Sequence, residues 1–242
     1  SGTRSRPFAR ICGATSARSS PAVRFIAVSR SMARRIEDLS PTGIVKVIPN
    51  WTDSRKIAMP KNVTTHRPFR VIYTGNMGLA QEIDLVIQLL THFSGHDDVE
   101  FYFIGGGVRR ADLTDVATGS AGNVKVLDYM SKDRLSAFLA ESDIGLVTLS
   151  PVLEGLALPT KTYTYLAAGL PLLTFGANHS DFEELIVPGW GRHFSPEELP
   201  EAIASIASWN QSWKEANSSS SARFIWWSWS SRSMNVDSPR CW

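Results

Sequence analysis

One lysine, Lys161, stands where its charge is unfavourable unless an anion lies beside it. Pro159 and Thr160 suit the start of a short helix, and Gly169 suits its end. A cation at a helix N-terminus opposes the helix dipole, whereas an anion there is stabilised by the dipole and by free backbone amides. The position of Lys161 therefore indicates an anion-binding role, and the alternative is an exposed, solvated lysine.

A glycine-rich turn is the second candidate for anion binding. This glycine loop, Gly75-Asn76-Met77-Gly78, joins a strand predicted at residues 69–74 to a helix predicted at residues 79–93. Its two glycines let the backbone approach a ligand closely, and amides at the start of a helix bind phosphate oxygens. The same pattern also fits a plain strand-to-helix turn. A phosphate site is favoured if Lys161 lies at the same edge of the fold.

A run of three glycines, Gly105-Gly106-Gly107, follows a strand predicted at residues 99–104 and precedes a helix. This is the setting of the dinucleotide-binding fingerprint G-x-G-x-x-G. Arg110 replaces the third glycine, however, and Asp128 is the nearest candidate for the acid expected about twenty residues later. A dinucleotide site is therefore an alternative that the sequence disfavours. Arg110 and its neighbour Arg109 suit either contact with a diphosphate or a solvated helix face.

The sequence contains no motif of a serine hydrolase or of a metal-dependent enzyme. No Gly-x-Ser-x-Gly turn is present, and the histidines show no metal-ligand spacing. These scattered histidines are His66, His92, His96, His179 and His193. The two cysteines, Cys12 and Cys241, lie near opposite ends and form no disulfide framework. The sequence does not support a hydrolase or a metalloenzyme, and a reducing, cytoplasmic setting fits it best.

The composition is that of an ordinary globular protein. Of its 242 residues, 43% are hydrophobic and 20% are charged, which is enough for one large or two modest domains. The net charge of +2 is too small to indicate a nucleic-acid surface, and no apolar run is long enough to span a bilayer. We therefore expect no nucleic-acid partner.

Strand and helix patterns alternate from residue 69 to residue 210. Further strands are predicted at residues 124–127, 144–149 and 170–175, and helices at residues 109–118, after Ser131, at 181–186 and at 196–208. Such alternation predicts an α/β fold, a Rossmann-like doubly wound parallel sheet with helices on both faces. Ligands bind such sheets at the carboxyl ends of the strands, where the glycine loop, the three glycines, residues 128–130 and residues 150–161 all fall.

The pattern divides the chain into five segments. Residues 23–48 read as a strand, a helix capped by Ser29 and a second strand; residues 49–68 as a polar linker; and residues 69–210 as the α/β domain. Residues 1–22 are Arg-rich, and residues 211–242 mix Ser, Trp and Arg. The first segment resembles a transit peptide or a basic arm, and the last allows a Trp-rich binding motif, but we expect both to be non-native. Because the chain begins with Ser1, we expect a fragment or a processed product.

Taken together, these segments resemble the C-terminal, donor-binding half of GT-B glycosyltransferases, especially glycosyltransferase family 4 and its branch that builds bacterial polysaccharides. The similarity covers residues 25–208 and rests on the order of its motifs. These motifs are Ile26-Ala27-Val28-Ser29-Arg30-Ser31-Met32, Val47-Ile48-Pro49-Asn50-Trp51-Thr52-Asp53, Val71-Ile72-Tyr73-Thr74 with the glycine loop, and Leu158-Pro159-Thr160-Lys161 with Tyr165-Leu166-Ala167-Ala168-Gly169-Leu170-Pro171. They resemble the end of the acceptor domain, the interdomain crossover, the first donor-domain strand and the nucleotide-sugar signature.

The resemblance implies a retaining transferase that needs no catalytic metal. Its donor would be a nucleoside diphosphate sugar, most often a UDP-sugar, and its acceptor a saccharide or a lipid-linked sugar. Lys161 and the glycine loop, with Gly105 beside it, would hold the diphosphate and stabilise its growing negative charge. A lipid-linked acceptor implies peripheral contact with the inner face of the membrane through the acceptor domain.

The same resemblance assigns the remaining site residues. Tyr129 and Met130 would lie near the base, and Glu154-Gly155-Leu156-Ala157 would face the donor sugar, which makes Lys161 and Glu154 the catalytic candidates. Thr164 stands where the family usually has a glutamate that contacts the donor. Leu156 stands where a second acid is expected, two positions after Glu154, and Asn76 stands where many members have a basic residue. We therefore expect altered donor affinity or identity.

Two further functional hypotheses stay open. Because most of the acceptor domain is missing, the chain is expected to have weak activity or none, and a non-catalytic nucleotide-sugar-binding module with a separate acceptor subunit would share the same loops. An unrelated flavodoxin-like interaction domain would use the glycines only structurally. That last reading is favoured if Gly75 and Lys161 lie on opposite edges of the sheet.

Overall fold

A computed structural model describes residues 23–57, 67–186 and 190–218. Its centre is a six-stranded sheet, paired in parallel throughout, with the order β5-β4-β3-β6-β7-β8. The strands are β3 (Phe69–Thr74), β4 (Val99–Ile104), β5 (Val124–Leu127), β6 (Ile144–Thr148), β7 (Leu172–Phe175) and β8 (Gly191–Phe194). The predicted α/β parallel sheet is confirmed. The Arg-rich segment 1–22, residues 58–66 of the predicted linker and residues 219–242 of the predicted tail lie outside the described residues.

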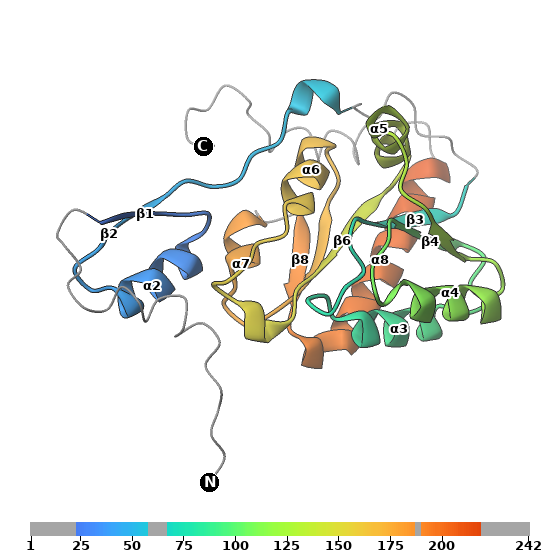
Figure 1. Cartoon of the computed structure of the whole chain (residues 1–242). Coiled ribbons are helices and arrows are strands. Elements are labelled where there is room, and N and C mark those ends of the chain that lie inside the picture. The colour runs from blue at the N-terminus through green and yellow to red at the C-terminus, as the bar shows by residue number, and fades with distance from the viewer. Residues whose placement is uncertain (1–22, 58–66, 187–189, 219–242) are drawn as a thin grey trace, which may run out of the picture.

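Helices cover both faces of the sheet (Figure 1). One face carries α3 (Ile83–His92), α4 (Arg110–Gly119) and α8 (Leu199–Ser218), and the other carries α5 (Lys132–Ala140), α6 (Lys161–Ala167) and α7 (Asp181–Leu185). From β3 the chain adds strands toward one edge of the sheet, β4 and then β5, and from β6 it adds β7 and β8 toward the other edge. The direction of strand order therefore reverses between β3 and β6. In doubly wound folds this switch point is the place where ligands bind, at the carboxyl ends of the strands.

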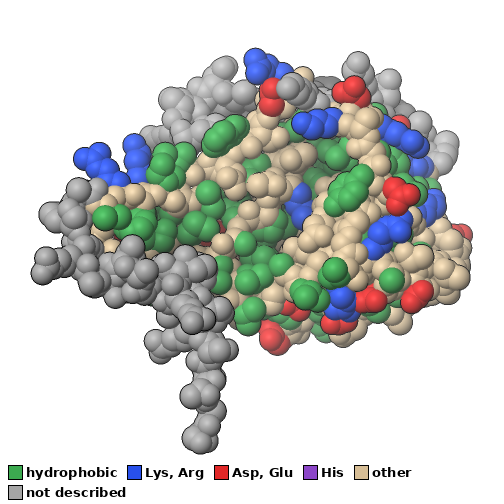
Figure 2. Space-filling model, viewed as in Figure 1, with side chains coloured by type: hydrophobic (Ala, Val, Ile, Leu, Met, Phe, Trp, Pro, Cys, Tyr) green, Lys and Arg blue, Asp and Glu red, His purple; other side chains and the backbone are tan. Residues whose placement is uncertain are grey.

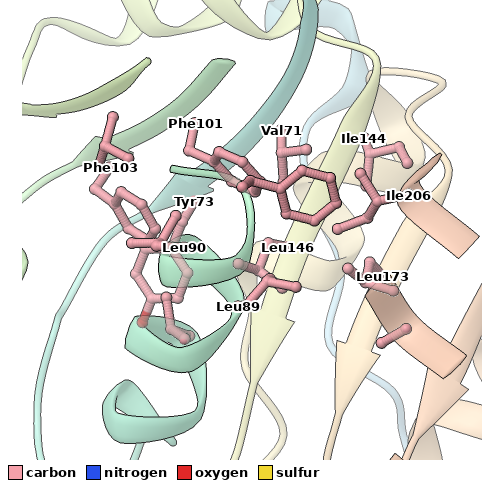
Figure 3. Packing of buried hydrophobic residues seen from close by; sticks show 14 of the residues in the cluster. Val71, Tyr73, Leu89, Leu90, Phe101, Phe103, Ile144, Leu146, Leu173 and Ile206 are labelled. Carbon is pink, nitrogen blue, oxygen red and sulfur yellow. The ribbon is translucent and has the colours of Figure 1, made fainter. Parts of the chain in front are cut away.

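The central strands are buried on both faces, as a parallel sheet requires. Side chains alternate along β3: Val71 and Tyr73 belong to the cluster under α3 and α8, whereas Ile72 belongs to the cluster under α5 and α6. Figure 3 shows the first cluster, in which Leu89 and Leu90 of α3 point toward the strand side chains. Burial on both faces explains why β3 and β4 read as continuous apolar runs.

A small unit precedes the main sheet and lies beside α7 (Figure 1). It consists of β1 (Arg24–Ala27), α2 (Arg30–Leu39) and β2 (Ile44–Val47), and its two strands pair in parallel. The Ser29 hydroxyl accepts a hydrogen bond from the Met32 amide at 3.2 Å, which confirms the predicted N-cap. The Ser31 amide donates to Asp181 Oδ1 at 3.0 Å, so α2 is tied to the start of α7.

Some elements differ from the sequence prediction. Helix α3 begins at Ile83 rather than residue 79, because the preceding residues form a turn in which the Gln81 amide donates to Gly78 O. The pattern misses β8, because this edge strand reads Gly-Arg-His-Phe and has no run of apolar residues. Helix α8 continues to Ser218, past the predicted end at 208 and into the segment predicted to be irregular. Trp213, which is 5% exposed and packs edge-on against Phe69, explains this extension.

A buried ion pair joins the amino ends of β3 and β6. Arg67 donates to both carboxylate oxygens of Asp143, from Nη1 to Oδ2 at 2.6 Å and from Nη2 to Oδ1 at 2.9 Å. Asp143 also accepts the Arg70 amide at 2.8 Å. The side chains of Arg67 and Asp143 are only 12% and 6% exposed, so water is a poor substitute for either partner.

We expect Asp143→Ala to lower the free energy of unfolding by about 3–5 kcal/mol, because it leaves the Arg67 charge buried and unpaired. The matched control is Glu141→Ala, which removes a carboxylate that pairs with Arg70 but is 67% exposed. That control is expected to cost less than about 1 kcal/mol. Urea denaturation measures both values, and equal losses would contradict the structural role given to Asp143.

Candidate functional site

The glycine loop and the three glycines after β4 pack backbone against backbone. The Gly75 amide donates to Ile104 O at 2.8 Å, and the Met77 amide donates to Gly106 O at 2.7 Å. Gly105 has a φ of +144°, and a Cβ on this residue would lie 2.1 Å from Gly75 O. Because no side chain fits there, glycine at position 105 lets the two loops meet at the carboxyl edge of the sheet.

Lys161 lies at the same edge, at the first residue of α6. Its Nζ lies 3.3 Å from the centroid of the Tyr73 ring and is buried, although the residue as a whole is partly exposed. No hydrogen-bond partner for this Nζ is found among the described residues. Burial lowers the pKa of the Lys161 ammonium well below its ordinary value of 10.5. Among the described contacts of the Lys161 Nζ, the Tyr73 ring face is the group that would stabilise its positive charge.

Tyr73 links Lys161 to the glycine loop. Its hydroxyl donates to the backbone oxygen of Asn76 at 2.7 Å, while its ring lies under the Lys161 Nζ. Burial raises the pKa of Tyr73, so the hydroxyl keeps its proton and remains a donor. One aromatic side chain at the end of β3 thus contacts both features that the sequence marks for anion binding.

A second tyrosine fixes the position of α6. The Tyr165 hydroxyl accepts the Thr74 amide at 2.7 Å and lies 3.0 Å from the Thr74 hydroxyl. A Cβ on Gly145 would lie 2.3 Å from the Tyr165 ring, so glycine is needed for this close packing on β6. These contacts hold α6, which carries Lys161 and the partly exposed Thr164, against the end of β3.

The two residues predicted to lie near a base differ in exposure. Tyr129 is 69% exposed, and its ring lies close to Gly106, where a Cβ would be 3.1 Å from the ring carbon Cε2. Met130 packs against the cluster under α5 and α6. Figure 2 shows that hydrophobic side chains lie among polar ones on the face of the molecule drawn there. Tyr129 therefore presents an open aromatic surface beside the glycine-rich loops.

Glu154 turns toward α7 and α2. Its Oε1 accepts the Asp181 amide at 3.2 Å, and its backbone oxygen accepts Arg35 Nη1 at 3.3 Å. Burial raises the pKa of the Glu154 carboxyl. Leu156 is partly buried in the same segment, where its amide donates to Leu153 O. The hydrogen bonds found for Glu154 in the described part of the chain thus connect elements rather than reach Lys161.

The arginines after the three glycines are engaged in ion pairs. Arg109 Nη2 lies 2.6 Å from Asp84 Oδ1, and Arg109 also pairs with Asp112. Arg110 lies 2.9 Å from Asp128 Oδ1. Because Arg110 holds the acid that a dinucleotide ribose would need, the structure gives the dinucleotide alternative no added support. Across residues 23–57, 67–186 and 190–218, no group of at least three His, Cys, Asp or Glu residues is arranged to hold a metal ion.

Gly75 and Lys161 both follow the carboxyl ends of neighbouring parallel strands, β3 and β6. They lie at one edge of the sheet, and the flavodoxin-like alternative therefore loses the arrangement that would favour it. Tyr73 and Tyr165 are the site residues that sequence reasoning missed. Each reads as part of an apolar core, and only the fold shows where its hydroxyl binds.

No protein-family model matches the sequence, and no curated protein matches it. Solved structures do. The chain is similar to the apo form of the lipopolysaccharide outer core galactosyltransferase WaaB, with a TM-score of 0.57 and 15% identity over 77% of this chain and 52% of that one. It is similar to the pneumococcal O-GlcNAc transferase GtfA in complex with UDP and GlcNAc, with a TM-score of 0.58 and 14% identity over 86% of this chain and 42% of that one.

A third similar structure is Anabaena Alr3699/HepE in complex with UDP and glucose, with a TM-score of 0.58 and 16% identity over 80% of this chain and 57% of that one. The described chain thus has the fold of GT-B glycosyltransferases, which confirms the predicted resemblance at the level of fold. It spans 52%, 42% and 57% of the length of these three chains. Within the described residues, no helix is both long and apolar enough to cross a membrane.

We expect Gly105→Ala to lower the free energy of unfolding by more than about 2 kcal/mol, because its Cβ would collide with Gly75 O and its φ is unfavourable for alanine. The matched control is Gly119→Ala at the end of α4, where a Cβ meets nothing within 4 Å. The control is expected to change stability by less than about 1 kcal/mol and to favour folding. Thermal and urea unfolding measure both, and a neutral Gly105→Ala would overturn the packing argument.

Proposed function

We propose that this chain binds the nucleoside diphosphate of a sugar donor and serves as the donor-binding part of a glycosyltransferase. The observation that carries this proposal is the Lys161 Nζ, which is buried and has no hydrogen-bond partner among the described residues. It lies over Tyr73, at the switch point of the sheet. A buried ammonium without a partner is costly, and a ligand anion would remove that cost.

The chemistry of glycosyl transfer suits this arrangement. The bond between the anomeric carbon and a diphosphate oxygen breaks, and negative charge grows on the departing diphosphate. Lys161 and amides of the glycine loop would stabilise that charge without a metal ion. UDP is the proposed nucleotide, because two of the three similar structures described above are complexes with UDP and a sugar. Transfer with retention is the stereochemistry that the family resemblance implies.

The remaining site residues are assigned around this donor. The exposed Tyr129 ring beside Gly106 offers a surface for the base, with Met130 packed behind it. Thr164 lies one helical turn after Lys161, where its hydroxyl would bond the ribose. The catalytic role expected for Glu154 stays a prediction, since its described contacts join α7 and α2. A saccharide or lipid-linked acceptor, bound at the membrane through another domain, belongs to the same proposal.

A non-catalytic nucleotide-sugar-binding module is the second candidate. The observation that favours it is the position of Glu154, the expected catalytic carboxylate, whose side chain accepts the Asp181 amide at 3.2 Å and whose backbone oxygen accepts Arg35. Both candidates require donor binding and differ only in turnover. Release of UDP from a UDP-sugar in the presence of a mixed saccharide acceptor pool distinguishes them, because only the transferase couples release to a glycosylated product.

We expect Lys161→Ala to weaken UDP binding by at least about 10-fold, since a hydrogen bond to a charged group is worth about 1.5–3 kcal/mol. Isothermal titration calorimetry measures the affinity, and EDTA is expected to leave it unchanged. The matched control is Lys46→Ala, which removes an exposed lysine of β2. Equal UDP affinity for the wild type and Lys161→Ala would overturn the role of Lys161.

Binding of UDP is also expected to take up a proton. Burial keeps the pKa of Lys161 well below 10.5, whereas a bound diphosphate would raise that pKa again. Between the two pKa values the complex holds more protons than the free protein, so affinity falls as pH rises through that range. Titrations in two buffers of different ionisation enthalpy measure the uptake. Lys161→Met is expected to abolish it, and an unchanged proton count in that variant would refute the linkage.

A further inference from the structure

We propose that Gln81 holds, before the donor binds, the amide hydrogen bond that a phosphate oxygen of the donor takes over. The inference rests on the proposed function and deepens it. It assigns to one side chain outside the recognised motifs the task of satisfying the Gly78 amide until an anion replaces it. The exchange involves one backbone amide, that of Gly78, and no covalent step.

The contact itself is specific. The backbone amide of Gly78 donates to the side-chain oxygen Oε1 of Gln81 at 2.9 Å. The backbone amide of Gln81 in turn lies 3.4 Å from Gly78 O. Because an amide N–H can only donate, the carboxamide atom that faces it is the oxygen and not the nitrogen. Gly78 is buried, and Gln81 is partly exposed. The side chain thus presents a neutral oxygen to a loop amide, where a phosphate would present a charged one.

This amide differs from its neighbours in what it binds. The Gly75 and Met77 amides donate to the backbone oxygens of Ile104 and Gly106, which cannot leave without separating the ends of β3 and β4. The partner of the Gly78 amide is a side chain, which can rotate away while the backbone stays in place. Among these three amides, Gly78 is therefore the one that a ligand can recruit without disturbing the fold.

The loop keeps its shape when Gln81 departs, because other contacts hold it on both sides of Gly78. The Tyr73 hydroxyl donates to Asn76 O at 2.7 Å, the Arg109 amide donates to Met77 O at 2.9 Å, and the Ser150 amide donates to Ala80 O at 2.8 Å. A preorganised amide costs little to bind an anion. Helix α3 meets Gln81 through the backbone, since the Ile83 amide donates to Gln81 O at 2.8 Å, and rotation of the Gln81 side chain leaves that bond in place.

The choice of glutamine over glutamate follows from this role. A neutral carboxamide gives up the amide to a charged phosphate oxygen, because hydrogen bonds to ionised acceptors are stronger. A carboxylate at the same place would keep the amide and repel the diphosphate. Replacing the Gln81 carboxamide by a carboxylate therefore strengthens the side chain in its competition with phosphate for the Gly78 amide. The size of the side chain stays nearly the same.

The test compares Gln81→Glu with Gln88→Glu, which adds the same charge on the exposed side of α3. Calorimetry with UDP and with uridine is carried out on both variants, on Gln81→Ala and on the wild type. Gln81→Glu is expected to weaken UDP binding by at least about 10-fold, the loss of a charge-assisted contact, and to leave uridine binding unchanged. As pH falls toward about 4.3, the ordinary pKa of glutamate, the new carboxylate takes up a proton. The difference in UDP affinity between Gln81→Glu and Gln88→Glu is therefore expected to shrink. Gln81→Ala is expected to bind UDP within about threefold of the wild type, since the amide stays available.

The outcomes separate this inference from the proposed function. If the wild type binds UDP and Lys161→Ala does not, but Gln81→Glu binds UDP as Gln88→Glu does, the exchange at Gly78 is overturned and the proposed function stands. A parallel loss of UDP and uridine binding in Gln81→Glu and Gln81→Ala assigns Gln81 a purely structural role and also overturns the exchange. A wild type that binds neither UDP nor uridine overturns the proposed function, and the exchange falls with it. Thermal unfolding of each variant confirms that binding is compared between folded proteins.

Discussion

The parallel pairing of β3 with β4 on one side and β6 on the other is the constraint on which the site depends. It brings the glycine loop, the three glycines and the segment before α6 to one edge of the sheet. Tyr73 lies near the end of β3, where its ring contacts the Lys161 Nζ and its hydroxyl donates to Asn76 O. A shift of β3 by one residue would turn Tyr73 to the opposite face and break both contacts at once.

The site combines a fixed backbone with movable side chains. The glycines at positions 75 and 105 are in direct contact, and Tyr165 fastens α6 to Thr74, so the framework has little freedom. Lys161, by contrast, rests on an aromatic ring without a hydrogen bond, and Gln81 holds a loop amide that it can release. Such a division lets a ligand replace internal contacts one by one instead of reorganising the loops, which keeps the cost of binding low.

Much of the fold followed from periodicity, because β3 and β4 are buried on both faces and alternate with amphipathic helices. The shared edge of Gly75 and Lys161 followed as well, since parallel strands end on the same side. The contacts of Tyr73, Tyr165 and Glu154 did not, because hydroxyl and carboxylate partners come from residues distant in the chain. Strand β8 was missed for a related reason: a short edge strand is defined by its neighbour β7 rather than by its own residues.

Helix α8 has a consequence for how the chain acquires its structure. It covers the face of the sheet formed by β3 and β4, where Trp213 meets Phe69 and where Asn210 and Lys214 meet Asp98. These partners are separated by more than a hundred residues, 112 and 116 for the two contacts with Asp98. During synthesis α3 and α4 can pack on this face early, but the part that α8 covers stays exposed until α8 itself has been made. Contacts between residues so far apart in the chain form late, which slows folding relative to a fold built from local contacts.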